Sequence, residues 1–251
     1  MYPSIHSRLY RRIRRFTAAR LAPGGAAGLY LTAGVLFFVV SACLFGAIAG
    51  QVARHGPLTL VDVQVANWFH VRASAGVTRA MLFITAWNSI GGVLAMSAIL
   101  GYALLRRRRD DWLLALVLAV PGGMAVNVLM KLAFARARPV FANPIVTLDT
   151  FSFPSGHASG AALFYGFLAC LLVRHARTRR ARVASVVGAT LMVALVGFSR
   201  IYLGAHYLSD VLAGVAEALA WLAVCLTAVS TLRRRRAQRG LPFGLPFWSR
   251  S

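Results

Sequence analysis

The chain has 251 residues, of which 59% are hydrophobic and only 14% are charged, and its formal net charge is +22. This composition excludes an ordinary soluble domain, in which about a quarter of the residues are charged. Such a charge favours nucleic-acid binding in a soluble protein, but the arginines here form short clusters between long apolar runs. The sequence therefore indicates a membrane protein, and nucleic acid is not an expected partner.

Six apolar runs with at most two charged residues are candidates for crossing a bilayer, which takes about 20 apolar residues. In chain order they cover residues 29–50, 80–105, 112–130, 158–173, 183–202 and 208–232. The N-terminal arginines resemble the start of a signal peptide, but the uncharged run 21–52 is too long for one. We predict an all-α bundle of six transmembrane helices, with its active site at the outer membrane face.

The arginine clusters predict the orientation of this bundle, because basic residues accumulate in cytoplasmic loops. With the N-terminus inside, most of the 28 basic residues fall on the inner side, at 8–20, 106–109, 174–182 and 233–250. We therefore predict a multi-pass protein of the cytoplasmic (inner) membrane with both termini in the cytoplasm. Its one membrane domain, 29–232, lies between the basic tails 1–28 and 233–251. Cys43, Cys170 and Cys225 fall within predicted spans and imply no disulfide or metal framework.

Seven basic residues remain on the outer side, which is periplasmic or extracellular, although the positive-inside bias works against them there. They are Arg54, Arg72, Arg79, Lys131, Arg136, Arg138 and Arg200, and Lys131 is the only lysine of the chain. Only three carboxylates, Asp62, Asp149 and Asp210, fall on the same side. An anionic ligand is therefore expected at the outer face.

Three outer segments carry polar residues: 131–139, 153–160 (FPSGHASG) and 199–210 (SRIYLGAHYLSD). Each has an ordinary structural explanation. Pro154-Ser155-Gly156 is typical of a turn and helix N-cap, Arg200 of a snorkelling side chain and Asp210 of a helix cap. Together, however, the three segments supply the groups that phosphoryl transfer requires.

Two kinds of group are present. Backbone N–H groups at a helix start and basic side chains can hold phosphate oxygens. The N–H candidates are Ser155, Gly156 and His157, and the basic candidates are Lys131, Arg138 and Arg200. The four-residue spacing of His206 and Asp210 lets the carboxylate reach the imidazole and fix its tautomer, if the segment is helical. His157 is then available for proton transfer.

The pattern Lys131-x6-Arg138-Pro139, Pro154-Ser155-Gly156-His157 and Ser199-Arg200-x5-His206-x3-Asp210 resembles the three-part signature of the type 2 phosphatidic acid phosphatases. This family includes bacterial undecaprenyl-diphosphate and phosphatidylglycerophosphate phosphatases. The resemblance implies that His206 attacks phosphorus to form a phosphohistidine, that Asp210 orients His206, and that His157 protonates the leaving oxygen and then activates water. It further implies that the phosphate binders are Lys131, Arg138, Ser155, Gly156 and Arg200.

The expected activity is hydrolysis of a membrane-lipid phosphomonoester or diphosphate, such as undecaprenyl diphosphate, phosphatidic acid or phosphatidylglycerophosphate. No cofactor and no metal are expected, because metal-dependent phosphoryl transfer usually collects several carboxylates. One alternative is a phosphotransferase that moves phosphate from undecaprenyl diphosphate to another lipid such as lipid A. A second is a non-catalytic binder or transporter of anionic lipid. Vanadate-dependent peroxidases share the signature, but they are soluble. The sequence leaves the oligomeric state open.

Three further features lie close to the predicted site. Glu217 follows Asp210 by two helical turns and is interpreted as a structural partner within the bundle, with a catalytic role left open. The outer segment 61–79 is predicted to lie at the membrane surface near the mouth of the site. If the helix that contains Lys131 persists to Arg138, these two cations lie on nearly one helix face, although Pro139 disfavours helical geometry there.

Overall fold

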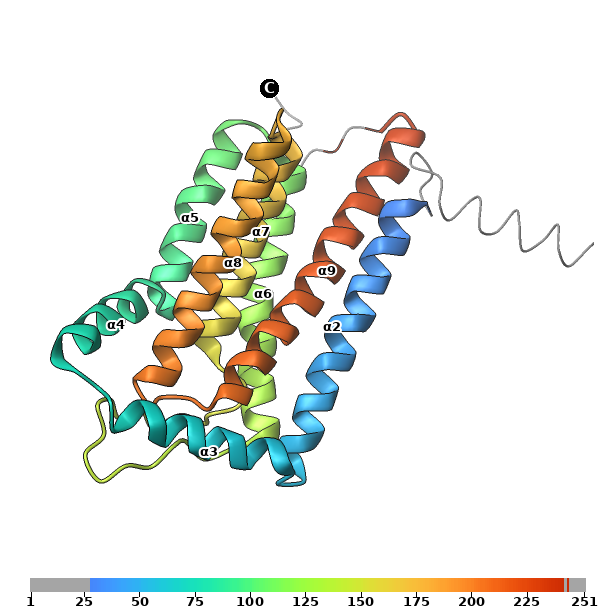
Figure 1. Cartoon of the computed structure of the whole chain (residues 1–251). Helices are drawn as coiled ribbons and strands as arrows, with labels where there is room; N and C mark the ends of the chain where they lie inside the picture. The colour runs from blue at the N-terminus through green and yellow to red at the C-terminus, as the bar shows by residue number, and fades with distance from the viewer. Residues whose placement is uncertain (1–27, 242, 244–251) are drawn as a thin grey trace, which may run out of the picture.

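Helices form most of the part of the chain that the computed structural model describes, residues 28–241 and 243, and no strand occurs in that part. In chain order they are α2 (Leu29–Ala53), α3 (Pro57–His70), α4 (Ala75–Trp87), α5 (Ile90–Arg106), α6 (Asp110–Phe134), α7 (Gly156–His175), α8 (Arg179–Tyr202) and α9 (Leu208–Gln238) (Figure 1). The predicted all-α fold is confirmed. Apart from Gly28, the basic tail 1–28 lies outside the described residues.

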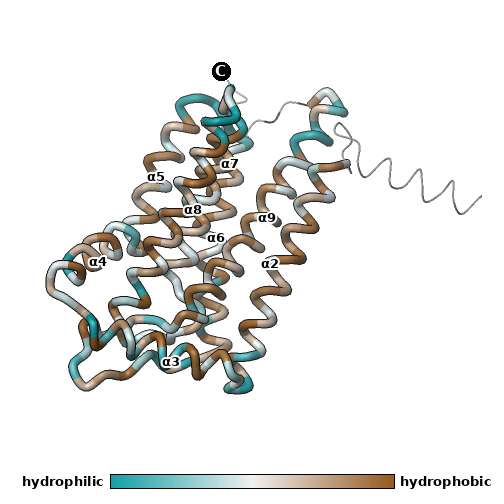
Figure 2. The backbone as a smooth tube through the Cα atoms, viewed as in Figure 1, coloured by the Kyte–Doolittle hydropathy of each residue, from teal (hydrophilic) through white to brown (hydrophobic). Residues whose placement is uncertain are grey.

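Five of the described helices are long and apolar enough to cross a membrane, and the bent pair α4–α5 makes a sixth candidate. Their outer surfaces are apolar. On α2, for example, Leu36, Phe37 and Val40 are 63%, 49% and 58% exposed. Side chains of this kind are stable when they face lipid, and Figure 2 shows the apolar colour along the length of α2. The protein is therefore a multi-pass membrane protein.

The predicted second span, residues 80–105, is not one continuous helix. The chain forms α4 and α5 instead, which meet at a bend of 50°. Asn88 and Ser89 lie at the break: Asn88 Nδ2 donates to the carbonyl oxygen of Ile84, and Ser89 Oγ accepts from the N–H of Gly92 as an N-cap. Asn and Ser side chains compete in this way for backbone groups and so favour helix ends over helix interiors.

The core lies between α5, α6, α7 and α9. Its buried side chains include Val93, Val120, Leu163, Phe167 and Leu222. The helix α9 contacts α2, α6 and α7. It also continues to Gln238, six residues beyond the expected span end, so that the cluster Arg233–Arg236 extends the helix.

The two ends of the bundle differ in structure. At one end α3 lies across the helix ends and closes that side of the molecule (Figure 1). This helix buries Asp62 and Ala66, whereas Leu60 and Trp68 on its outer side are exposed. An apolar outer side favours a position at the membrane interface. At the other end the arginine-rich connections between α5 and α6 and between α7 and α8 lie beside the C-terminal end of α9.

Candidate active site

The predicted site residues come from four different helices and the connections next to them, and all of them lie at the end crossed by α3. Lys131 is in the last turn of α6, Gly156 and His157 begin α7, Arg200 is in the last turn of α8, and Asp210 is in the first turn of α9. Arg138, Ser155 and His206 lie in the connecting segments. Because successive helices alternate in direction, segments far apart in sequence meet at this one end.

The imidazole of His206 lies between Arg138 and Asp210. Its Nε2 is 3.2 Å from the Arg138 guanidinium, and its Nδ1 is 3.5 Å from Asp210 Oδ2. An arginine can only donate a hydrogen bond, so Nε2 must be the acceptor and Nδ1 must carry the proton. The lone pair of Nε2 is thereby directed to the side of the ring where Arg138 lies.

His206 is buried, and it lies in the connection between α8 and α9. Burial lowers the pKa of the His206 imidazole to about 4; Arg138 and Arg200 act in the same direction and Asp210 opposes them. At neutral pH the ring is therefore uncharged, which is the protonation state that a nitrogen nucleophile requires.

The carboxylate of Asp210 is completely buried and surrounded by donors. It accepts from Arg136 NH1 at 2.7 Å, from Ser152 Oγ at 2.5 Å and from the backbone N–H of Tyr207 at 2.9 Å. Three donors besides His206 fix the orientation of this carboxylate and stabilise its charged form. Asp210 in turn holds His206 in one orientation.

The helix α6 ends at Phe134, and Ala135 follows it in a left-handed conformation with φ of 44°. Lys131 and Arg138 therefore do not share a continuous helix face. Both reach the same loop instead: Lys131 Nζ donates to the Phe151 carbonyl at 2.8 Å, and Arg138 Nε donates to the Thr150 carbonyl at 2.6 Å. The two cations converge through the loop and not through the helix.

Ser155 is the residue before α7, and its backbone N–H donates to the carbonyl of Asp210 at 2.9 Å. That N–H, expected to hold phosphate, is already engaged. The Ser155 hydroxyl is buried and has no hydrogen-bond partner among the described residues. A Cβ on Gly156 would lie 3.2 Å from Asn127 Oδ1 and 3.7 Å from Lys131 Cε, so the start of α7 lies close to the end of α6.

Arg200 is also buried, and its NH1 donates to Thr85 Oγ1 of α4 at 2.5 Å. Its Nε finds no acceptor within the described part of the chain. His157 follows Gly156 in the first turn of α7, so it begins that helix close to the end of α6 that carries Lys131. The cluster thus contains the three basic side chains of Lys131, Arg138 and Arg200 and the two histidines His157 and His206.

Two residues of the site were missed by the motif analysis. Arg136 donates from NH2 to Asp62 Oδ2 at 2.8 Å and from NH1 to Asp210 Oδ1 at 2.7 Å, so it bridges two buried carboxylates. Asp62 also accepts from the N–H and the hydroxyl of Ser209. The signal in the sequence was an acid within the apolar run Val61-Asp62-Val63 and an outer arginine with no assigned role.

Glu217 lies below the site in α9, where its Oε2 accepts from Asn127 Nδ2 of α6 at 2.8 Å. This contact ties α6 to α9 beneath Gly156, as a structural partner would. Over residues 28–241 and 243, no three His, Cys, Asp or Glu side chains gather in a way that would hold a metal ion.

Comparison with known proteins agrees with this geometry. The sequence model of the PAP2 superfamily matches residues 112–234, which include every predicted site residue. Phosphatidylglycerophosphatase B of Bacillus subtilis is 32% identical over 177 residues, which cover 70% of this chain and 86% of the relative. Undecaprenyl-diphosphatase BcrC of the same organism is 31% identical over 147 residues, which cover 55% and 68%.

A solved structure is also similar. The crystal structure of a transmembrane PAP2-type phosphatidylglycerolphosphate phosphatase from Bacillus subtilis aligns with a TM-score of 0.65 at 27% sequence identity, covering 80% of this chain and 96% of that one. The chain belongs to the PAP2 superfamily. It is a membrane-embedded lipid phosphatase.

The close approach of α9 to Ser155 gives a first prediction. A Cβ on Gly214 would lie 2.5 Å from the Ser155 carbonyl oxygen, whereas a Cβ on Gly188 of α8 meets no described atom within 4 Å. Gly214→Ala must therefore move the Ser155 loop, and we expect phosphatase activity to fall by about tenfold or more. Gly188→Ala is the matched control and should keep wild-type activity. Equal activity of both variants in purified form would contradict the close approach.

The Arg136 bridge gives a second prediction. Asp62→Asn removes one of the two charges that Arg136 neutralises, and it weakens the contact that fixes the orientation of the guanidinium beside Asp210. We expect about a tenfold or greater loss of kcat with normal membrane insertion, because Asp210 loses a fixed donor. Gln64→Asn, on the exposed side of the same helix, is the control. Wild-type kcat in Asp62→Asn would mean that the bridge is not needed for catalysis.

Proposed function

We propose that the protein hydrolyses the phosphate or diphosphate head group of a membrane lipid through a phosphohistidine on Nε2 of His206. The observation that carries this proposal is the position of the His206 ring, with Arg138 donating to Nε2 and Asp210 facing Nδ1. A neutral imidazole held in this tautomer has its nucleophilic lone pair next to a phosphate-binding cation.

In the first step Nε2 of His206 attacks phosphorus, and the bond from phosphorus to the lipid oxygen breaks. The imidazolium that forms is stabilised by Asp210, which already lies at Nδ1. His157 donates a proton to the departing oxygen, so the lipid leaves as an alcohol or, from a diphosphate, as a monophosphate. Lys131, Arg138 and Arg200, together with the Ser155 hydroxyl and the Gly156 backbone, neutralise the equatorial oxygens.

In the second step His157, now neutral, removes a proton from water. The resulting hydroxide attacks the phosphohistidine, the bond between phosphorus and Nε2 breaks, and inorganic phosphate leaves. His157 lies in the first turn of α7, next to the end of α6 that carries Lys131, which supports its position beside the reacting phosphate. The anionic phosphate is expected to raise the basicity of His157 when it enters this cationic cluster.

The substrate proposal rests on the fold and on the named relatives. The names of two relatives point to phosphatidylglycerophosphate and undecaprenyl diphosphate as substrates. An apolar bundle with the site at one end suits a lipid whose head group enters the site while its tail stays in the bilayer. The arginine-rich loops lie at the opposite end, so the positive-inside bias favours a periplasmic or extracellular site with both termini in the cytoplasm.

Phosphate release from a panel of lipids tests the activity directly. The panel is undecaprenyl diphosphate, phosphatidic acid, phosphatidylglycerophosphate and lipid A, with purified protein in neutral detergent. We expect free phosphate from at least one lipid, a covalent phosphoprotein after rapid quenching, and a fall to background in His206→Ala. His175→Ala, at the other end of the bundle, should retain activity.

The same assay separates the alternatives. Label that moves between lipids without release of free phosphate would favour the phosphotransferase. Lipid binding that survives in His206→Ala, without turnover in the wild-type protein, would favour a non-catalytic binder or transporter.

Removal of divalent metal gives a further prediction. Basic side chains and helix-start N–H groups neutralise the phosphate here, so we expect full activity in excess EDTA. Complete loss in EDTA that magnesium restores would overturn the mechanism. The measurement compares phosphate release by untreated protein with phosphate release in EDTA by protein that has been dialysed against a chelator.

A further inference from the structure

A second cationic site lies at the end of the bundle opposite the catalytic residues. A cavity of about 500 Å³ opens there between α6, α7 and α9, and it is bordered by the first turn of α2. Four arginines line it: Arg174 and Arg182 from the two sides of the connection between α7 and α8, and Arg233 and Arg234 from α9. None of them belongs to the catalytic machinery described above.

The protein supplies few anions to this end. Among the described residues, the only carboxylate that lines the cavity is Asp111, whose Oδ2 is 3.0 Å from Arg233 NH1. Arg109 also approaches Asp111, with 3.7 Å between Nε and Oδ1. Of the six acidic residues of the chain only Asp110 and Asp111 lie at this end, against the arginines of three clusters. The positive charge that remains needs anions from outside the described fold.

The arginines on α9 that line the cavity contact other residues of its wall. Arg233 is fixed by Asp111, and the Arg234 guanidinium lies 4.2 Å from the ring centroid of Tyr30, another residue of the cavity wall. A guanidinium has five N–H donors in a fixed plane, so the ion pair with Asp111 leaves donors of Arg233 for a phosphate. Arg174 and Arg182 are exposed at the opening.

The inner wall of the cavity is apolar. It contains Trp112, Val173, Leu226 and Val229. Trp112 Nε1 is buried and no residue of the described chain accepts its hydrogen bond. A site with an apolar wall, an unpaired buried donor and cations at its opening matches an amphiphile that carries an anionic head group.

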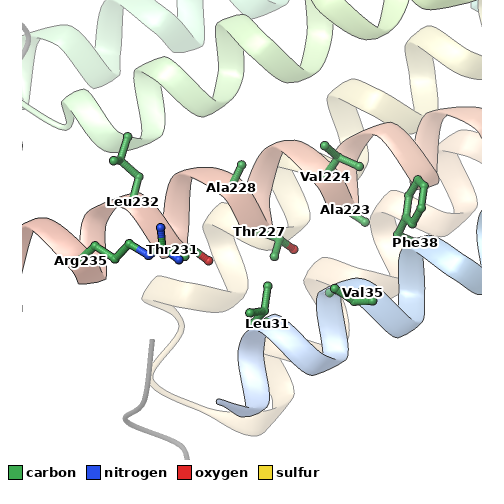
Figure 3. A pocket seen from close by; sticks show the side chains of 11 residues that line it. Leu31, Val35, Phe38, Ala223, Val224, Thr227, Ala228, Thr231, Leu232 and Arg235 are labelled. Atoms are coloured by element: carbon green, nitrogen blue, oxygen red, sulfur yellow. The ribbon is translucent and has the colours of Figure 1, made fainter. Parts of the chain in front are cut away.

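The neighbouring groove between α2 and α9 provides a contrast. Its volume is about 390 Å³, and Figure 3 shows Leu31, Val35 and Phe38 of α2 facing α9, with Arg235 at one end. It offers one arginine where the cavity offers four. A lipid chain can lie in this groove as on any apolar helix surface, so the groove carries no selectivity for anions.

We propose that the cavity between α6, α7 and α9 binds an anionic phospholipid of the membrane leaflet at the arginine-rich end, with its phosphodiester at the four arginines and acyl chain carbons against the Trp112 wall. Basic pockets between transmembrane helices bind anionic lipid head groups in this way. Residues 1–27, 242 and 244–251 contain no acidic side chain, so they add no Asp or Glu to balance these arginines. The bound lipid contacts α2, α6, α7 and α9 and links them at the end of the bundle opposite the catalytic site.

The test uses the full chain in neutral detergent, with phosphatidylglycerol (one phosphate), diphosphatidylglycerol (two phosphates) and zwitterionic phosphatidylcholine as separate additions. Thermal unfolding and native mass spectrometry report the Tm and the number of lipids retained. We expect either anionic lipid to raise the Tm by about 5 °C at saturation and phosphatidylcholine to have little effect. A response at lower concentration for diphosphatidylglycerol supports contact of both phosphates with the cavity.

Two variants with equal charge locate the site. Arg174→Gln with Arg182→Gln removes two cavity arginines, and Arg177→Gln with Arg179→Gln removes two arginines of the same connection that do not line the cavity. We expect the first pair to weaken anionic-lipid binding about tenfold and the second to bind as wild type. Phosphatase activity on a detergent-soluble substrate should stay within twofold in both, because the catalytic site is at the other end.

Three results would overturn the proposal. An equal loss of lipid response in the two variant pairs would mean that total surface charge attracts the lipid. An equal response to phosphatidylcholine would remove the selectivity for an anion. The absence of any shift and of any retained lipid in the wild-type protein would leave the cavity without this ligand. If a cavity variant has a lower Tm in detergent alone, the number of lipids retained in native mass spectra still shows whether it binds the anionic lipid.

Discussion

The fold of the catalytic end depends on one partly buried cation that pairs with two buried carboxylates. Arg136 lies between Asp62 of α3 and Asp210 of α9, at 2.8 and 2.7 Å, and both carboxylates are completely buried. Removal of one partner from such a network typically costs about 3–5 kcal/mol, because it leaves an uncompensated charge. The bridge therefore holds α3 across the bundle, and through Asp210 it also sets the orientation of His206.

The two ends of the bundle use their arginines differently. At the catalytic end Arg136 is neutralised by protein carboxylates, whereas Arg138 and Arg200 have none within hydrogen-bonding distance and donate to neutral groups. These two are therefore available to an incoming phosphate. At the other end the arginines outnumber the carboxylates in every connection. A chain with six acidic residues and 28 basic ones must take its remaining counter-charges from its surroundings, and anionic lipid head groups at the membrane surface attract such basic clusters.

The sequence predicted the helical class and the membrane setting because apolar run length is a local property. It also predicted that one end of the bundle holds Lys131, Arg138, His157, Arg200, His206 and Asp210. Successive spans alternate in direction, and this alternation determines which connections lie on the same side. It did not predict the break at Asn88 and Ser89, where two polar side chains cap helix ends in an otherwise apolar run. It also missed the pairing of Arg136 with Asp62, 74 residues apart, because such a contact depends on where α3 lies in the folded molecule.

The helix α9 connects these two ends physically. It carries Asp210 in its first turn and Arg233 and Arg234 near its last, and it contacts α2, α6 and α7 along its length. Gly214 lets its first turns approach Ser155, and Glu217 binds Asn127 one turn further on. A helix so fixed at its catalytic end transmits little motion along its axis, because packed interiors deform little. An anionic lipid at the arginine end therefore stabilises α9 within the bundle, and the geometry of His206 and Asp210 stays set by the local contacts with Arg136, Arg138 and Ser152.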